Sequence, residues 1–161
     1  MKGVVMRFSA KYLAMALALI LLALPALAKP NFSGDWKVNV SKSEFGQMPA
    51  PSSMTGKITH QDPSLKVAIK QSGERGEFEY EMSYSTDGKE TTNEIRDNTM
   101  KSTAKWDGDV LVIDTKGSFG GNDVTIQDKM SLSADGKTLT LKRHFSSSMG
   151  EADQALILEK Q

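Results

Sequence analysis

The sequence predicts a single all-β domain, an up-and-down antiparallel meander barrel of about 8–10 strands. Turn signals recur at short, even intervals, and three of them are Asp-Gly pairs, which suit the positive φ of hairpin turns. The runs between them hold roughly seven to ten residues rich in Thr, Val, Ile, Tyr and Phe, and no long helical pattern interrupts them. The turn signals are Asp62-Pro63-Ser64, Gly73 to Gly76, Asp87-Gly88, Asp97-Asn98, Asp107-Gly108, Gly120-Gly121-Asn122, Asp135-Gly136 and Met149-Gly150.

Residues 1–28 have the three parts of a secretory signal peptide. A basic start is followed by an almost unbroken apolar run over residues 12–24, and small residues precede a cut after Ala28. The apolar run is short for a membrane span, although an uncleaved anchor helix is the alternative interpretation. We therefore expect one domain over residues 29–161, in a secreted or periplasmic location.

The composition of the mature chain excludes several classes of partner. Without the basic residues Lys2, Arg7 and Lys11, 17 basic residues face 20 acidic ones, and no basic run remains to attract nucleic acid or anionic membranes. The chain contains no cysteine, so it forms no disulfide and carries no lipoprotein anchor. Residues 29–161 hold no second apolar segment long enough to cross a bilayer, so no stable membrane anchor is expected after cleavage.

The hydrophobic pattern predicts which residues point into the barrel. Residues 77–84 alternate strictly, which places Phe78, Tyr80, Met82 and Tyr84 on one face. The turn positions continue this face from strand to strand, and a slip of one residue would turn a strand inside out. Closing the sheet removes its exposed edges. The expected pairs are Ile69–Tyr80, Val67–Met82, Tyr80–Ile95, Met82–Asn93, Ile95–Met100, Ala104–Leu111, Ser102–Ile113, Leu111–Leu132 and Ile113–Met130.

The start of the mature chain resembles that of a known group of barrels. The segment Asn31-Phe32-Ser33-Gly34-Asp35-Trp36 is similar to the F-x-G-x-W opening of the first strand in lipocalins and fatty-acid-binding proteins, the calycin group. Later stretches resemble small secreted bacterial lipocalin-like proteins, so that the resemblance covers nearly all of residues 30–161. These stretches are Thr86 to Glu90, Lys105 to Gly108 and Gly150 to Gln154.

The resemblance implies a barrel that holds a small, mostly apolar ligand and is closed at one end by Gly34 and Trp36. Two departures limit what it implies. Residues 41–53 are too short and too rich in Pro and Ser for the helical lid of intracellular fatty-acid-binding proteins. The disulfides common in animal lipocalins are missing.

Two charged residues stand on an otherwise apolar face. Pairing across Asp135-Gly136 sets Asp128 opposite Arg143, among Ile126, Met130, Leu132, Leu139, Leu141 and Phe145. Buried charges are costly unless they are paired, so an ion pair inside the barrel is expected.

Three interpretations of this pair remain open. The pair is structural, or Arg143 packs on Trp36 to close one end of the barrel, as a late-strand arginine does in calycins. Alternatively, Arg143 binds the carboxylate or phosphate head group of a ligand and Asp128 orients it. In the third case the register is wrong and both residues lie at the rim.

The other inward positions predict a cavity of mixed character. Six of them are polar: Gln71, Thr91, Asn93, Ser102, Thr115 and Gln154. A packed core avoids so many groups that need hydrogen-bond partners, whereas a wet cavity tolerates them; the alternative is that several touch solvent near the open end. The candidate ligand-binding residues are Arg143, Asp128, Tyr80, Met82, Tyr84, Asn93, Met100, Trp106 and Met130, with Phe78 as a further wall residue.

Catalytic and metal-binding signals are weak. The sequence has no cysteine nucleophile, Gly-x-Ser-x-Gly elbow, P-loop or zinc motif. The two histidines, His60 and His144, lack a second histidine at ligand spacing, so we expect no metal and no cofactor. His60 and Asp128 are the only candidates for a catalytic acid or base in the barrel.

These patterns predict a binding protein for a small hydrophobic or amphipathic molecule with, as one option, a carboxylate. The first alternative is a packed barrel that binds proteins or serves the envelope through the loops at residues 41–53 and 146–153. The second is an enzyme on the same barrel. An internal void distinguishes the ligand-binding protein from the packed barrel.

Overall fold

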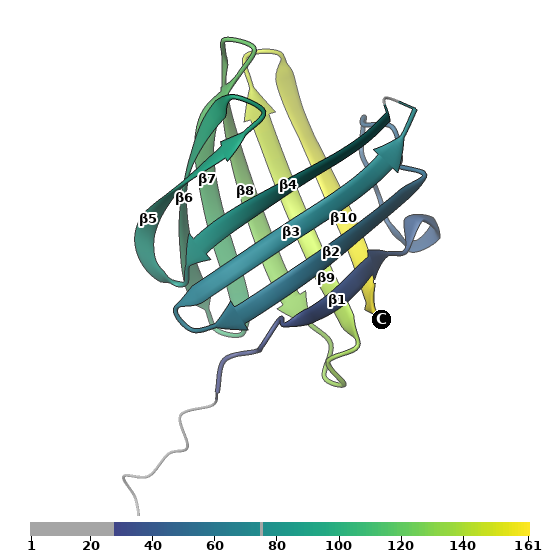
Figure 1. Ribbon diagram of the computed structural model, residues 1–161, viewed down its shortest axis with the longest axis vertical. Coiled ribbons are helices and arrows are strands. Elements are labelled where there is room, and N and C mark those ends of the chain that lie inside the picture. The colour runs from purple at the N-terminus through teal and green to yellow at the C-terminus, as the bar shows by residue number, and fades with distance from the viewer. Residues whose placement is uncertain (1–27, 75) are drawn as a thin grey trace, which may run out of the picture.

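The protein folds into one ten-stranded antiparallel sheet in strand order β4-β3-β2-β1-β10-β9-β8-β7-β6-β5 (Figure 1). The computed structural model describes residues 28–74 and 76–161, so residues 1–27 of the predicted signal peptide lie outside the described residues. The elements are β1 (Gly34–Val38), the 3₁₀ helix η1 (Val40–Lys42), β2 (Ser53–Gln61), β3 (Ser64–Gly73), β4 (Gly76–Ser85), β5 (Asp87–Ile95), β6 (Asn98–Asp107), β7 (Val110–Phe119), β8 (Asn122–Leu132), β9 (Thr138–Ser147) and β10 (Gly150–Lys160). The predicted up-and-down barrel is confirmed.

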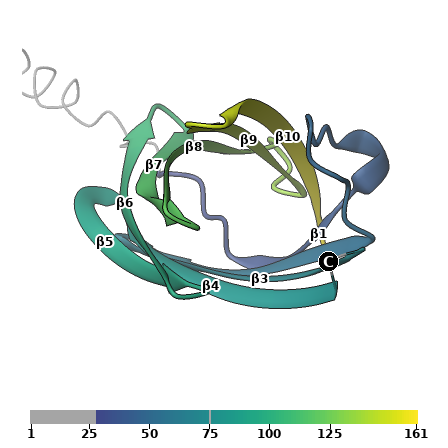
Figure 2. The same ribbon diagram turned by 90° about the horizontal axis from the view of Figure 1, so that it is seen from above.

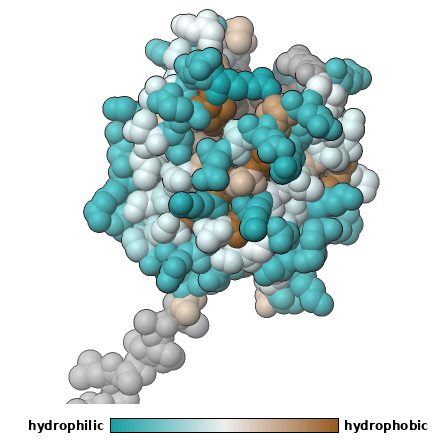
Figure 3. All heavy atoms as spheres, in the orientation of Figure 1, coloured by the Kyte–Doolittle hydropathy of each residue, from teal (hydrophilic) through white to brown (hydrophobic). Residues whose placement is uncertain are grey.

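The sheet curls into a flattened, nearly closed barrel. Strands β1–β4 form one wall and cross the opposite wall of β7–β9 at a steep angle (Figures 1 and 2). Because successive side chains of a strand point to opposite faces, β2 buries every second residue. The outer face of β2–β4 is mostly hydrophilic (Figure 3) and carries ion pairs such as Lys70–Glu79, with 2.7 Å between Nζ and Oε1.

Two predicted registers are confirmed and three are shifted. Ile69 pairs with Tyr80 and Asp128 with Arg143, as predicted. The structure instead pairs Asn93 with Met100, Ala104 with Ile113, Ser102 with Thr115, and Leu111 with Met130. The turns sit one residue away from the predicted positions, at Arg96-Asp97, Gly108-Asp109 and Gly120-Gly121. Moving a turn by one residue changes the pairing by two, so every side chain keeps its predicted face.

The predicted pairing of β4 with β5 is wrong. These strands are the two edges of the sheet, and no backbone ladder joins them in the described residues. The side chain of Asn93 spans the gap instead. Its Nδ2 donates to the carbonyl of Ser83 at 3.1 Å and its Oδ1 accepts the Ser83 N–H at 2.7 Å. The amide thereby takes the place of one backbone partner.

An aromatic cluster fills the end of the barrel at which β1 begins. Phe32 is fully buried and stacks on His60 and Trp106, with ring centroids 5.6 and 5.7 Å away. Trp36 is 1% exposed, and its Nε1 donates to the carbonyl of Phe32 at 2.9 Å. The Lys160 ammonium covers its ring at 5.4 Å. We call this packed end, which includes Trp36, the closed end; that Trp36 closes the barrel stays a prediction.

Gly34, the other residue predicted to close the barrel, has a backbone that favours glycine. Its φ is +145°, and a Cβ there would lie 2.6 Å from Cε of Lys160. A side chain at position 34 would therefore displace the lysine that covers Trp36.

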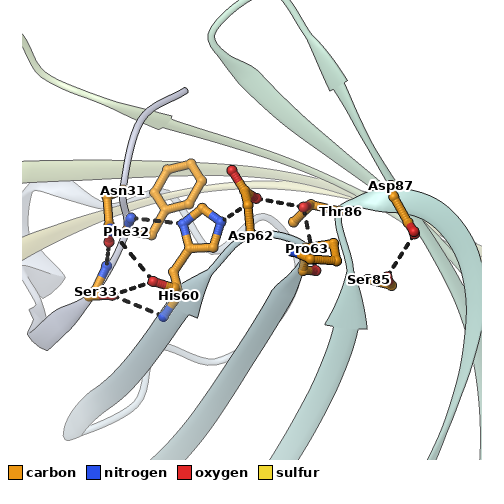
Figure 4. Close-up of polar contacts among 9 residues, drawn as sticks. All are labelled: Asn31, Phe32, Ser33, His60, Asp62, Pro63, Ser85, Thr86 and Asp87. Atoms are coloured by element: carbon orange, nitrogen blue, oxygen red, sulfur yellow. Dashed lines mark hydrogen bonds and ion pairs between the residues drawn. The ribbon is translucent and has the colours of Figure 1, made fainter. Parts of the chain in front are cut away.

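A polar chain ties this closed end together (Figure 4). Nδ1 of His60 accepts the N–H of Phe32 at 3.3 Å, so its Nε2 carries the proton and donates to Oδ1 of Asp62 at 2.9 Å. The hydroxyl of Thr86 donates to the same oxygen at 2.6 Å. This bond is the main reason that the pKa of Asp62 lies below its ordinary 3.8, with His60 adding to the effect. The N-terminal segment, the β2–β3 turn and the β4–β5 turn are joined in this way.

Truncating the centre of the aromatic cluster should destabilise the fold strongly. Phe32→Ala removes a fully buried ring, so we expect a loss of about 3–5 kcal/mol in the free energy of unfolding measured in urea. Phe119→Ala is the matched control because Phe119 is 36% exposed. It should cost less than about 1 kcal/mol. If both variants lost the same free energy of unfolding, the closed end would not be the better packed part of the barrel.

Removing the amide that spans the edge strands should loosen them. Asn93→Ala leaves the N–H and carbonyl of Ser83 without these partners, at a cost of about 1–3 kcal/mol. Hydrogen exchange followed by mass spectrometry should show faster exchange at residues 81–85. Thr92→Ala, on the exposed face of the same strand, should leave that exchange unchanged. Unchanged exchange in Asn93→Ala would contradict the bridging role.

Acid should weaken the closed end through Asp62. Its folded-state pKa lies below 3.8, so the ionised carboxylate adds stability above pH 3.8, and this contribution is lost as the pH falls through the folded value. We expect the urea midpoint of Asp62→Asn to fall less than that of the wild type between pH 5 and pH 2.5. Thr86→Val should likewise show a smaller fall in urea midpoint between pH 5 and pH 2.5 than the wild type. If the urea midpoints of all three proteins fell equally with pH, Asp62 would not contribute to the acid sensitivity.

Candidate functional site

A bidentate ion pair lies on the inner face of the barrel, where β8 and β9 set Asp128 opposite Arg143. Nε of Arg143 donates to Oδ1 of Asp128 at 2.7 Å and Nη2 donates to Oδ2 at 2.8 Å. The carboxylate is 8% exposed and the arginine side chain 26%. The nearby carboxylate raises the pKa of Arg143 further above its ordinary range, so the guanidinium is ionised at every relevant pH.

Two cavities border this pair. The mouth cavity has a volume of about 290 Å³ and the inner cavity about 60 Å³. The lining of the mouth cavity includes the exposed residues Met48, Arg96 and Phe119, so this cavity reaches solvent at the end opposite the closed end. The residues that line both cavities are Tyr80, Met82, Tyr84, Asp128 and Arg143. The ion pair is therefore the polar centre of an otherwise mainly apolar interior.

The two tyrosines beside the pair stay protonated. Burial raises the pKa of both Tyr80 and Tyr84. The Arg143 guanidinium lies close enough to Tyr80 to oppose part of this rise. The hydroxyl of Tyr84 donates to the sulfur of Met82 at 3.0 Å. The surroundings of the ion pair thus add neutral hydroxyls and no further charge.

The mouth cavity continues toward solvent along an aromatic wall. Phe78 stacks on Tyr80 with 6.0 Å between ring centroids, and the guanidinium of Arg96 lies 4.3 Å from the centroid of Phe78. Sequence reasoning missed Arg96, because the β5–β6 turn was placed one residue too far along the chain. Ile126 and Phe145 also line this cavity, and they stood on the predicted apolar face.

Seven of the nine candidate ligand-binding residues border a cavity. Met100 lines the mouth cavity, Met130 the inner cavity, and the others are the five residues that line both. Asn93 and Trp106 do not. The amide of Asn93 is engaged by Ser83 across the sheet edges, and the indole of Trp106 belongs to the aromatic cluster at the closed end.

Three of the six predicted polar inward residues hydrogen-bond to one another. Ser102 and Thr115 form a buried hydrogen bond of 2.8 Å, and the hydroxyl of Thr91 donates to the carbonyl of Ser102 at 3.3 Å. Only Thr115 and Gln154 of the six line the mouth cavity. The interior near β5–β7 is therefore more packed than the polar count alone indicates.

The position of Arg143 distinguishes among the three interpretations of the ion pair. Lys160, not Arg143, covers Trp36. Asp128 is only 8% exposed, which places the pair inside the barrel and not at the rim. The structural role and the ligand-binding role of the pair both remain compatible with this position.

The catalytic candidates are engaged in other contacts. Asp128 is paired with Arg143, and both ring nitrogens of His60 are hydrogen-bonded at the closed end. Among the described residues, no group of three or more metal-ligating side chains lies close enough to hold an ion. No helix in the same part of the chain is long and apolar enough to span a membrane.

No family model and no curated protein matches the chain, whereas its fold resembles several solved structures. Zebrafish ileal bile acid-binding protein, solved with cholic acid, has a TM-score of 0.58 and 17% identity over 81% of this chain and 98% of its own. A secretory abundant heat soluble protein from Ramazzottius varieornatus gives 0.55 and 14%, over 80% and 94%.

A third similar structure is the Schistosoma mansoni fatty acid binding protein in complex with arachidonic acid. It has a TM-score of 0.51 and 12% identity, over 81% of this chain and 96% of its own. At identities this low the likeness shows the fold alone: the chain has an up-and-down barrel of ten antiparallel strands that resembles the barrels of these structures.

Proposed function

We propose that this protein binds a small hydrophobic or amphipathic molecule inside the barrel. The observation that carries the proposal is a cavity of about 290 Å³ that reaches solvent, has mainly apolar walls and ends at the Asp128–Arg143 pair. The chain of the ligand lies against Met82, Ile126 and Phe145, and its polar end meets the ion pair. Binding is driven by burial of apolar surface, at roughly 25 cal/mol per Å².

The lining of the mouth cavity supports this role. Small-molecule sites commonly measure about 300–1,000 Å³, with apolar walls and a few polar groups that orient the ligand. The volume of about 290 Å³ lies just below this range, so the cavity suits a small ligand. Two proteins of similar fold were solved with cholic acid and with arachidonic acid, both amphipathic molecules. By contrast, the engaged state of His60 and Asp128 gives no support to a catalytic role.

We also propose that the protein acts as a secreted or periplasmic protein. This proposal rests on the signal-peptide pattern of residues 1–28, with residues 29–161 as the mature binding domain.

A second candidate is a protein-binding module that uses the loops at the mouth. Met48 and Met149, which are 40% and 80% exposed, lie in these loops and favour this alternative, because exposed large apolar side chains often mark interaction sites. A protein-binding module needs no cavity. A substitution that fills the cavity therefore distinguishes the two candidate functions, because it should abolish only the binding of a small molecule.

Filling the mouth cavity should abolish ligand binding. Ile126→Trp puts a large ring into the lining, whereas Thr125→Trp puts the same ring on the exposed face of the same strand. We expect the neutral fluorescent probe N-phenyl-1-naphthylamine to bind at least about tenfold more weakly to Ile126→Trp and with unchanged affinity to Thr125→Trp.

Native mass spectrometry of the purified wild type, followed by extraction of any carried lipid, identifies the natural cargo. If the probe bound equally to both tryptophan variants, or not at all to the wild type, binding inside the barrel would be refuted. The protein-binding alternative would then be preferred.

A further inference from the structure

We propose that Asp128 determines the charge class of the ligand: the site accepts a neutral polar end, such as a hydroxyl or an amide, and disfavours a carboxylate. This inference rests on the proposed function, because it concerns the polar end of a molecule held in the mouth cavity. It assigns Asp128 a role in specificity beyond holding Arg143 in place.

The charge balance of the interior is the first support. Among the described residues that line the cavities, the charged ones are Asp128, Arg143 and Arg96. Arg96 is exposed at the mouth, where water and salt screen its charge. Deeper inside, two short hydrogen bonds hold the carboxylate and the guanidinium together, so the polar centre carries no net charge.

A carboxylate ligand would add a third charge to this balanced pair. Arg143 would attract it, but Asp128, less than 3 Å from the same guanidinium, would repel it. The ligand would lose its hydration shell without gaining a matching net attraction. A ligand that displaced Asp128 from Arg143 would strand a carboxylate that is only 8% exposed, which is equally unfavourable.

A neutral hydroxyl or amide matches what the pair still offers. A guanidinium has five N–H donors, and the bonds to Asp128 use one on Nε and one on Nη2. Nη1 is not used by Asp128, and the carboxylate oxygens keep further lone pairs. The arginine side chain is 26% exposed and borders both cavities. A group that both donates and accepts can therefore bond to both members of the pair.

The experiment compares two ligands that differ only in the polar end. Decan-1-ol and decanoic acid suit a cavity of about 290 Å³, which has room for roughly ten groups of the size of water. Their affinities are measured at pH 7 and fixed salt by displacement of N-phenyl-1-naphthylamine. For the wild type we expect the alcohol to bind on the order of tenfold more tightly than the ionised acid.

Asp128→Asn should reverse this preference, since it leaves the Arg143 charge without its carboxylate. The matched control is Asp114→Asn, which changes the net charge of the protein equally but lies on the exposed outer face. It should keep the preference of the wild type. If Asp128→Asn unfolds in part, added decanoic acid should raise its melting temperature more than decan-1-ol does, because a ligand that binds the folded state stabilises it.

The double variant Asp128→Asn, Arg143→Gln keeps a neutral, polar pair of similar size. It should bind the alcohol within a few-fold of the wild type and show no gain for the acid. A wild type that binds decanoic acid as tightly as decan-1-ol would overturn this inference and leave the proposed function standing. If neither compound displaced the probe from any variant, or the probe itself did not bind, the proposed function would fail as well.

Discussion

The alternation of side chains along ten paired strands is the constraint on which the barrel depends. Each strand supplies the interior with every second residue, so a single strand out of phase would place charges inside and apolar side chains in water. The outer lysines and glutamates of β2–β4 and the inner methionines and tyrosines arise from the same period of two. The pairing of β1 with β10 then places the first and last strands side by side in the sheet.

The two ends of the barrel differ in what fills them. At the closed end, aromatic rings and the His60–Asp62–Thr86 chain use their polar atoms on one another and on nearby backbone, which leaves little for a ligand to contact. At the opposite end the side chains are spread around a solvent-reaching cavity. One domain thus combines a packed end with an end that contains a solvent-reaching cavity.

The ion pair stands where these two regions meet. A lone guanidinium in this apolar interior would be unfavourable, and so would a lone carboxylate, whereas the bidentate pair satisfies both at once. This neutrality underlies the proposed preference for an uncharged polar end, since the same arginine without Asp128 would leave an unbalanced positive charge inside the barrel. The gap between β4 and β5 is bridged in a comparable way, because the buried amide of Asn93 bonds to both the N–H and the carbonyl of Ser83.

The sequence by itself determined the fold class, the inward face of each strand and the Asp128–Arg143 pair. These follow from local alternation and from the Asp-Gly turn between β8 and β9, and alternation tolerates shifts of two residues. Only the tertiary structure decided the turn centres at Arg96-Asp97, Gly108-Asp109 and Gly120-Gly121, because flanking glycines and asparagines allow neighbouring positions almost equally. The partners of Asn93 and Trp106, and the size and position of the cavity, depend on how distant strands approach once the sheet has curled, which no local pattern encodes.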